Sequence, residues 1–422
     1  MDSTPPHLRR PREDVDVDRW SWLPPDILLE IFRRLAATDL VRCAGACKPW
    51  RRAIIGNAAS CLRPQPDRFL PDLLIGFFEQ RKHGVRFLRT PGPFQSLLAA
   101  RSAAADDTAC RETVCSFVPA TAGGGVNLAS YNKLLSSRDG LLLLRGSAVD
   151  DLCLCNAMTG GCEFLPAAAF PAHMYALVTG HDLSPSDDDL ATRILAVEFK
   201  DTSVTAYQVF SCTSGAGAWG AVKSSTSAEL KDALRVFNFL DKIRVFNFCG
   251  TEVVCGGAVH WIAYCTHQWC VDPCVVSMSI DVKTGRTRTT ELPEQCQQLG
   301  LLDAMHSVFL TTSGDGLLSV VMAVIGEVQV WVLTGGDRWT LRRTIDMQSQ
   351  LGLFPDSAFM SVRLSAFCPR SGYLVGNVPG QKIVLIDIER GTLRQIRCLA
   401  SWREYHPYEM DWSTYISKMK HF

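Results

Sequence analysis

The chain has 422 residues, of which 43 are Lys or Arg and 43 are Asp or Glu, so its formal net charge is zero. This balance argues against a general nucleic-acid-binding protein, because such proteins neutralise phosphates with an excess of basic residues. Hydrophobic residues make up 47% and charged residues 20% of the chain, which is typical of a folded globular protein. At roughly 100–200 residues per domain, the length predicts more than one folded unit.

Residues 1–19 are rich in charge and contain no apolar run, so we expect a disordered lead rather than a secretory signal. Residues 253–271, a long stretch without Asp, Glu, Lys or Arg, are interrupted by glycines and polar residues, and no membrane-spanning segment is predicted. The 17 cysteines are therefore expected to be free thiols in a reducing compartment, without disulfides. This places the protein in the cytoplasm or the nucleus.

Residues 20–62 show the pattern of helices. Pro24, Pro25 and Asp26 open the first, because proline is favoured in the first turn and an acidic side chain complements the helix dipole. Apolar residues then recur at the spacing of one helix face, at Leu28, Ile31, Phe32 and Leu35. A second helix is predicted with Thr38 as its N-cap, and a third begins at Pro49.

The apolar face of the first predicted helix is wide. Ile27 and Leu29 extend it beyond what a surface helix needs for its own small core. Three short helices also make a marginal domain by themselves. Two interpretations follow from this pattern: the outer side packs on an obligatory partner protein, or the helices cap the rest of this chain.

Several motifs in this region occur in the order of the F-box, which the segment resembles. They are the opening Leu23-Pro24-Pro25-Asp26, the central Leu40 and the closing Cys47-Lys48-Pro49-Trp50-Arg51, with Ala46 where valine is more usual. The resemblance implies docking on the small adaptor subunit of SCF-type ubiquitin ligases and, through it, on cullin. The residues that it implies for this contact are Leu23, Pro24, Asp26, Ile27, Leu28, Ile31, Phe32, Leu40 and Trp50.

From about residue 130 to 400 the chain consists of short apolar segments separated by turns rich in Gly, Pro, Asp and Ser, which predicts β-strands. Four segments share a rhythm of four strands each, namely 132–166, 252–293, 306–347 and 362–399. In the third of them the strands are predicted near 307–311, 317–325, 328–333 and 339–345. A similar turn recurs within these repeats and ends at Gly160, Gly285 and Gly391.

Repeats of this length with four strands each predict a β-propeller. The spacing of the recurring turns indicates about six blades within residues 67–422, while seven blades, a solenoid and a β-sandwich are alternatives. The fold class is therefore a small all-α F-box followed by an all-β propeller. The aromatic segment 398–416 is predicted to join the first and last blades, against strands from residues 67–118.

The amino-acid sequences of the repeats show a second resemblance. The stretches 137–143, 155–166 and 257–261 are similar to the C-terminal domains of a large plant family of F-box proteins. Those domains are predicted or known propellers related to kelch repeats. Together, the two resemblances imply a substrate-recognition subunit of an SCF-type ubiquitin ligase, whose propeller binds a target protein that the sequence does not identify.

Motifs for catalysis or cofactors are weak. The G-x-G-x-x-G at 215–220 lacks a following helical pattern and is predicted to be a blade hairpin. The spacing of a structural zinc site is absent from the one cluster that could suggest zinc, namely His260, Cys265, His267, Cys270 and Cys274. Cys153 and Cys155 share one strand face, which suits packing, and Asp187-Asp188-Asp189 is predicted to be a solvated loop. We predict no metal, no cofactor and no catalytic nucleophile.

The overall prediction is a non-catalytic receptor that binds an adaptor and a target protein, but no nucleic acid and no membrane. The alternative is a propeller scaffold or ligand sensor outside the ligase system. A propeller hydrolase or oxidase is a third hypothesis. Trp219 and Trp269 are either anchors for a target or part of the blade core.

Overall fold

The computed structural model divides the chain into two compact units, Met1–Leu62 with Met419–Phe422, and Arg63–Lys418. The structure describes residues 23–35, 37–57, 69–81, 84–90, 112–113, 121–122, 126–127, 130–146, 151–157, 161–180, 182–183, 192–199, 205–212, 217–225, 243–244, 252–265, 274–299, 307–335, 338–351, 362–378, 383–396 and 405–410. The predicted lead at 1–19, the acidic stretch 187–189 and Trp269 lie outside these residues. No helix among the described residues has the length and apolar character needed to span a membrane.

The first unit contains three helices, α1 (Pro25–Arg34), α2 (Ala37–Ala46) and α3 (Lys48–Gly56). Pro25 occupies the first turn of α1, and acidic Asp26 at the start and basic Arg33 and Arg34 at the end complement the helix dipole. The core of the unit is formed by side chains from all three helices, namely Phe32, Leu40, Ala44 and Ile54.

The second helix begins earlier than the sequence predicts. Thr38 lies inside α2, which starts at Ala37, so its assignment as the N-cap was wrong. Alanine is the strongest helix former, which favours a first turn that includes it. The third helix also begins one residue before Pro49, and Cys47 precedes it in an extended conformation.

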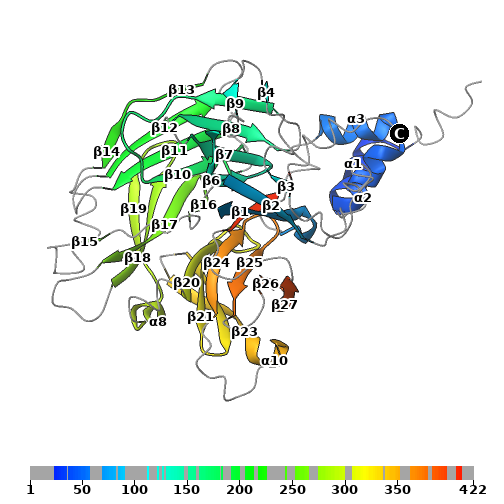
Figure 1. The fold of residues 1–422 in the computed structure, drawn as a ribbon. Helices are drawn as coiled ribbons and strands as arrows, with labels where there is room; N and C mark the ends of the chain where they lie inside the picture. The colour runs from blue at the N-terminus through cyan, green and yellow to red at the C-terminus, as the bar shows by residue number, and fades with distance from the viewer. Residues whose placement is uncertain are drawn as a thin grey trace, which may run out of the picture. The chain divides into compact units, whose positions relative to one another are not determined.

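The second unit is a six-bladed β-propeller (Figure 1). We number its blades in chain order. Blade 1 contains β28 (Tyr405–Glu409), β1 (Leu74–Arg81), β2 (Gly84–Arg89) and β3 (Glu112–Thr113), and blade 2 contains β6 (Lys133–Arg138), β7 (Leu141–Arg145), β8 (Leu152–Asn156) and β9 (Gly161–Leu165). Blade 3 contains β10 (Met174–Val178), β11 (Thr192–Phe199), β12 (Thr205–Cys212) and β13 (Ala218–Trp219), and β14 (Lys223–Ser225) also pairs with β12.

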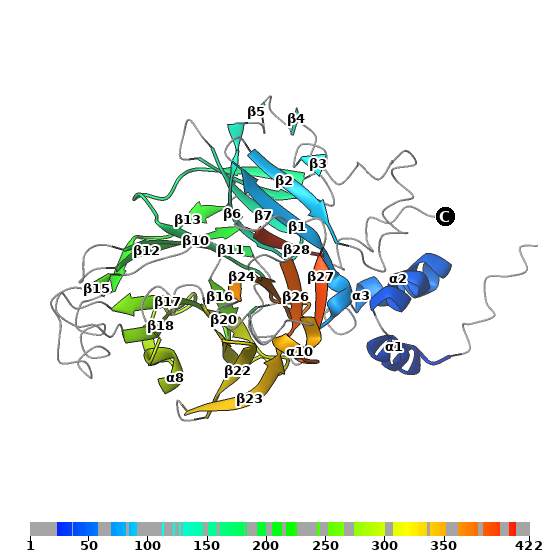
Figure 2. The ribbon, with the colours of Figure 1, turned by 60° about the horizontal axis from the view of Figure 1, so that its bottom comes forward.

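Blades 4 to 6 complete the ring (Figure 2). In blade 4, β15 (Ile243–Arg244) and β16 (Val253–Cys255) both pair with β17 (Ala258–Cys265), which is followed by β18 (Cys274–Asp281) and β19 (Thr287–Glu291). Blade 5 contains β20 (Val308–Thr312), β21 (Leu318–Val324), β22 (Glu327–Thr334) and β23 (Arg338–Asp346), and blade 6 contains β24 (Arg363–Cys368), β25 (Tyr373–Asn377), β26 (Ile383–Asp387) and β27 (Thr392–Ile396). The shorter elements are η1 (Pro71–Leu73), β4 (Thr121–Ala122), β5 (Val126–Asn127), α8 (Glu294–Gln297) and α10 (Met347–Leu351).

The hydrophobic core of the propeller lies between neighbouring blades. Leu143 and Leu154 of blade 2 pack in one cluster with Tyr175 of blade 3. On the other side of blade 3, Met174 belongs to a cluster with Trp261 of blade 4. Successive strand residues thus point to opposite faces and bury against two different neighbours, which explains the continuous apolar runs of these strands.

The recurring turn between the third and fourth strands has one physical basis. In blade 4 the Asp281 carboxylate accepts hydrogen bonds from the backbone N–H groups of Lys283 and Thr284, at 3.0 and 2.6 Å. In blade 6 the carboxylate of Asp387 does the same. The glycine that ends each turn has a positive φ, 73° at Gly285, which glycine adopts without a steric penalty.

The ring is closed by a strand from the C-terminal region, as the sequence predicts. β28 pairs antiparallel with β1, so that Phe78 lies opposite His406. The buried ring of Tyr408 makes edge contacts with Phe78 and Phe87, at centroid distances of 5.2 and 5.8 Å. This pairing removes the free edge that β1 would otherwise present.

Residues 217–220 of the glycine-rich stretch are part of blade 3, and residues 215 and 216 lie outside the described residues. A strand, β14, follows this stretch instead of the helix that a dinucleotide site requires. A Cβ at Gly217 would come within 2.4 Å of the Phe210 ring, which explains the glycine. Trp219 packs on the same ring at 5.2 Å and donates a hydrogen bond from its indole to the Pro166 carbonyl at 2.8 Å, so it belongs to the blade.

Candidate functional site

The outer face of α1 is apolar and accessible. Ile27 and Ile31 lie one helical turn apart and are 50% and 42% exposed. Pro24 is exposed just before the helix, and Leu23 and Leu28 are half-buried beside it. We define these five residues as the α1 face.

The remaining residues predicted for adaptor binding have different positions. Phe32 and Leu40 are buried, so their side chains support the α1 face from the core of the three helices and do not form its surface. Trp50 is half-buried and packs edge-on against Phe32, with ring centroids 5.8 Å apart. Asp26 is exposed in the first turn of α1.

Ion pairs on α1 lie among its polar residues. Glu30 is 2.8 Å from Arg34 and 3.5 Å from Arg33. Because all three side chains are well exposed, these pairs add little to stability. The helix therefore combines a solvated ionic side with an apolar face suited to a protein partner.

A second constellation lies at the centre of the propeller. The inner strands of the blades contact one another around the ring: β28 contacts β6 and β24, β6 contacts β10, and β20 contacts β16 and β24. At the C-terminal ends of β6, β10, β24 and β28, charged and hydroxyl side chains from four blades meet. We call them the closure network: Arg138, Asp139, Thr179, Asp182, Arg370, Ser371 and Glu409.

Two arginines hold the closure network together. The guanidinium of Arg138 donates to both carboxylate oxygens of Asp182, at 2.7 and 2.5 Å. Arg370 donates to both carboxylate oxygens of Asp139, at 2.8 Å each, and also to Asp182 at 2.9 Å. Bidentate pairs of this kind fix geometry as well as supply energy. They join blade 6 to blades 2 and 3.

The closing strand enters the same network. The Glu409 carboxylate accepts from the backbone N–H groups of Arg370 and Ser371, at 3.1 and 2.7 Å, and from the Ser371 hydroxyl at 2.5 Å. Asp139, at φ 47°, is the one residue other than glycine with positive φ in the described chain, and it accepts a hydrogen bond from Thr179. Blades 6, 1, 2 and 3 are therefore tied to one another across the closure.

Two parts of the chain match models of known protein families. The family model described as F-box-like matches residues 20–58. A second model, described as "Domain of unknown function (DUF7595)", matches residues 126–422, which is more than half of the chain. The chain belongs to the DUF7595 family. A comparison with curated proteins gives no significant match.

Among solved structures, the DUF7595 protein is similar to several at low identity. They include a nidogen/laminin complex (9% identity, 78% of this chain and 95% of that chain, TM-score 0.38) and a hypothetical selenium-binding protein from Sulfolobus tokodaii (9%, 82% and 95%, 0.37). A periplasmic gluconolactonase of Pseudomonas aeruginosa is a third (15%, 77% and 81%, 0.35). At these identities and scores none of the three bears on the function of this chain.

The electrostatics of the closure network follow from its burial. Burial acts to raise the pKa of Asp182, but the guanidinium groups of Arg138 and Arg370 outweigh it, so the pKa lies below its usual value. Burial raises the pKa of Glu409 in spite of the hydrogen bonds from Ser371. The DUF7595 domain thus carries a buried, paired and hydrogen-bonded ionic cluster, the kind of cluster that is costly to break.

Further buried titratable groups lie at the first two strands of blade 4, β16 and β17. Burial raises the pKa of Glu252 to about 6 and that of the Cys255 thiol to about 11. Burial also lowers the pKa of His260 to about 4. Cys255 donates to the Gly316 carbonyl at 3.3 Å, which links the turns of blades 4 and 5 at the same end as the closure network.

Three of the five His and Cys residues of the predicted zinc alternative lie on blade 4. Cys265 and Cys274 lie opposite each other on β17 and β18, and His260 lies further along β17. His267 and Cys270 lie outside the described residues. In the part of the chain that the structure describes, the group of side chains close enough to share a metal ion lies elsewhere, in blade 2, and contains Cys153, Cys155 and Cys162.

Sequence reasoning found the α1 face but missed the closure network. Part of it was visible, because Arg138-Asp139-Gly140 belongs to the stretch that resembles plant F-box proteins. Their partners Asp182 and Arg370 lie in blades 3 and 6, far from Arg138 and Asp139 in the sequence. No local pattern connects these positions, and only the closed ring brings them together.

Proposed function

We propose that this protein is the substrate-recognition subunit of an SCF-type ubiquitin ligase, with the α1 face docked on the adaptor subunit and the propeller binding a target protein. The observation that carries the proposal is the coincidence of two findings. The F-box-like match covers residues 20–58, and within it Ile27 and Ile31 are exposed large apolar side chains of the helical unit.

F-box domains generally bind the small adaptor of SCF ligases, and the adaptor joins them to cullin. An F-box followed by a propeller is an architecture typical of non-catalytic adaptor proteins. In the proposed role the chain makes and breaks no covalent bond. It accelerates ubiquitin transfer by holding the target close to the enzyme that carries activated ubiquitin, which raises the effective concentration of the target.

The proposal also assigns the propeller to the kelch-like domains of plant F-box proteins, on the strength of the stretches at 137–143 and 257–261. It places the protein in the cytoplasm or the nucleus, where its many unpaired thiols would stay reduced; eight of the described cysteines are free. A fluorescent fusion seen in a secretory compartment would contradict this placement.

The test is adaptor binding by a variant in which the α1 face is made polar. In the double substitution Ile27→Glu with Ile31→Lys, the new side chains form an ion pair four residues apart, so the helix is kept while the apolar face is lost. We expect adaptor capture from a purified mixture to fall by at least tenfold, because apolar anchors at the centre of an interface carry most of the binding energy.

The matched control is Ile325→Lys, which changes an isoleucine of blade 5 that is 70% exposed. It should capture the adaptor as well as the unmodified chain does. A second disruptive variant, Leu23→Ala with Pro24→Ala, removes the opening of the α1 face without adding charge. Full adaptor binding by both disruptive variants would overturn the proposal and favour a propeller scaffold outside the ligase system.

A further inference from the structure

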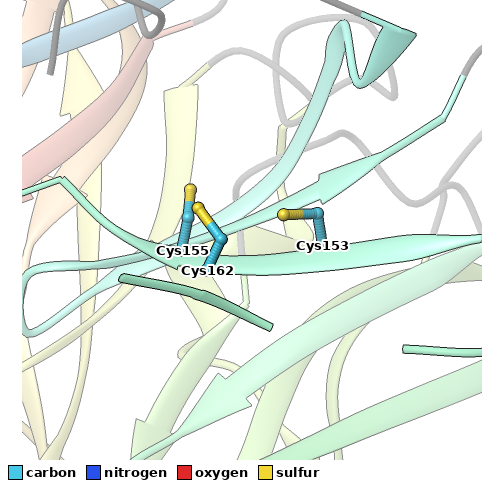
Figure 3. A group of neighbouring side chains, drawn as sticks. All are labelled: Cys153, Cys155 and Cys162. Carbon is cyan, nitrogen blue, oxygen red and sulfur yellow. The ribbon is translucent and has the colours of Figure 1, made fainter. Parts of the chain in front are cut away.

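Three cysteines converge on the outer half of blade 2. Cys153 and Cys155 lie two residues apart on β8 and therefore on the same face of the sheet. Cys162 lies on β9 directly opposite Cys155. The three sulfur atoms all lie within 4.8 Å of one another, and Figure 3 shows the Cys153 sulfur turned toward the other two.

The surroundings leave this group buried at one end and accessible at the other. Cys153 and Cys155 are buried, at 0% and 1% exposure, whereas Cys162 is half-buried. Phe164, opposite Cys153, packs against Tyr131 at 5.5 Å between ring centroids, so aromatic rings border the group. The half-buried Cys162 gives a small ion or its carrier a way to reach the sulfurs.

The spacing of the sulfurs suits a metal centre. With metal–sulfur bonds of about 2.3 Å, three sulfurs around one ion lie about 4 Å apart. The observed upper limit of 4.8 Å is close enough for small rotations of the side chains to reach this value. Each sulfur is also held by the ladder of β8 and β9, which limits the entropy lost on binding.

We propose that Cys153, Cys155 and Cys162 form a binding site for a single thiophilic metal ion, and that their three-sulfur set selects monovalent copper. Thiolates are the soft ligands that monovalent copper prefers. Structural zinc sites take four protein ligands, and the group has three members among the described residues. On binding, the ion replaces thiol protons, which pass to the solvent.

This inference goes beyond the proposed ligase function and does not depend on it. It also departs from the prediction, made from the sequence, that the protein binds no metal and that Cys153 and Cys155 serve packing alone. The spacing Cys153-x-Cys155 was visible in the sequence. The third sulfur was not, because Cys162 joins the group only through the hairpin between β8 and β9.

The experiment is a titration of the full-length, fully reduced chain with monovalent copper, without oxygen and against a chromophoric copper chelator. Because other cysteines also bind copper weakly, the measured quantity is the number of equivalents that the protein retains against the chelator. We expect Cys162→Ser to retain one equivalent fewer than the unmodified chain. X-ray absorption of the singly loaded protein should show three sulfur neighbours around copper.

The control is Cys47→Ser, which changes another half-buried cysteine, in the helical unit, at a position before α3 where serine is favoured. It should retain as much copper as the unmodified chain. Thermal unfolding of each variant establishes that it is folded, and Cys155→Ser provides a second test if Cys162→Ser is not. Equal copper retention by the folded serine variants and the unmodified chain would overturn the site.

A parallel titration with zinc distinguishes the metals. Retention of zinc in place of copper by these three cysteines would keep the site and overturn the choice of metal. A reduced chain that retains neither ion, and that forms a Cys155–Cys162 disulfide in air, would show a redox pair and overturn the proposal.

Discussion

The helical unit and the propeller distribute their polar and apolar side chains in opposite ways. The helical unit leaves Ile27 and Ile31 on its surface, although a small domain has little apolar surface to spare. The propeller buries charged side chains, including those of Asp139 and Asp182, close to its centre. One unit thus exposes apolar side chains to solvent, and the other supplies the partners of its own charges.

This contrast separates two sources of specificity. Exposed apolar groups contribute little to the stability of the fold that carries them and become valuable when a partner covers them. Buried charges cost free energy unless each is paired, so they stabilise one arrangement of the blades over others that would leave them unpaired.

Removal of residues 400–422 should have the largest effect, because it deletes the closing strand β28. Without this strand, β1 loses one of its two neighbouring strands. It also loses the buried aromatic contacts of Tyr405 and Tyr408. We expect aggregation, or a fall of more than 10 °C in the melting temperature, measured by light scattering and calorimetry.

The matched control for the truncation is Tyr408→Phe. It removes a hydroxyl that donates to the Gly140 carbonyl over 3.3 Å and keeps the buried ring. Its cost should be about 1 kcal/mol. A truncated chain that stays monomeric with an unchanged melting temperature would show that β28 does not close the ring.

The second prediction concerns the closure network. Arg370→Met leaves Asp139 buried without its bidentate partner, which should cost about 3–5 kcal/mol in the free energy of unfolding. The measurement is denaturant-induced unfolding of the propeller. Arg342→Met is the control, because Arg342 also pairs with an aspartate, Asp315 at 2.7 Å, but on the surface, where the loss should be below 1 kcal/mol. Equal losses in the two variants would contradict the special role of the buried pair.

The third prediction is a pH dependence that arises from His260. Its folded pKa, about 4, lies below the unfolded value of 6.5, so the native state holds the neutral ring. The stabilisation is present above pH 6.5 and is lost as the pH falls toward 4. Between pH 7 and pH 5 the loss should reach up to about 2 kcal/mol. The slope of stability against pH should be shallower in His260→Gln, and identical slopes would refute this assignment.

The smallest effect should come from the α1 face. The substitution Ile27→Glu with Ile31→Lys should change the stability of the helical unit by less than about 0.5 kcal/mol, because both side chains are well exposed. Phe32→Ala, which empties the core beneath the same helix, should cost about 3–5 kcal/mol. Circular dichroism of the full chain at increasing temperature separates the two cases.

Local patterns predict most of the fold. The four strands of blade 5 lie within one residue of the predicted ends, because alternating burial and the turn glycines are encoded locally. The number of blades is confirmed, and so is the closing strand, since aromatic residues near the end of a chain indicate burial. Blade 1 was hard to predict, because β28 and β1 come from distant parts of the sequence.

Two features that sequence reasoning missed depend on the pairing of strands and blades. The Arg370–Asp139 pair and the third cysteine of blade 2 arise only when strands are brought together. The N-cap error at Thr38 has another origin, because helix ends are set by small differences in propensity. Phe32 shares the helical spacing of the α1 face and Leu40 lies on α2, and the packing of the three helices buries both side chains.

The closing strand has a consequence for the order of events during synthesis. The helices of residues 25–56 are complete early and make local contacts, so they can fold while the rest of the chain is still being translated. The edge of β1 must wait for residues 405–409, which are made after every other strand of the ring. A chain whose synthesis stops in the last blade would therefore have a finished helical unit and an open, aggregation-prone propeller. Under the proposed function, such a fragment would occupy adaptor subunits without a closed ring to recognise a target.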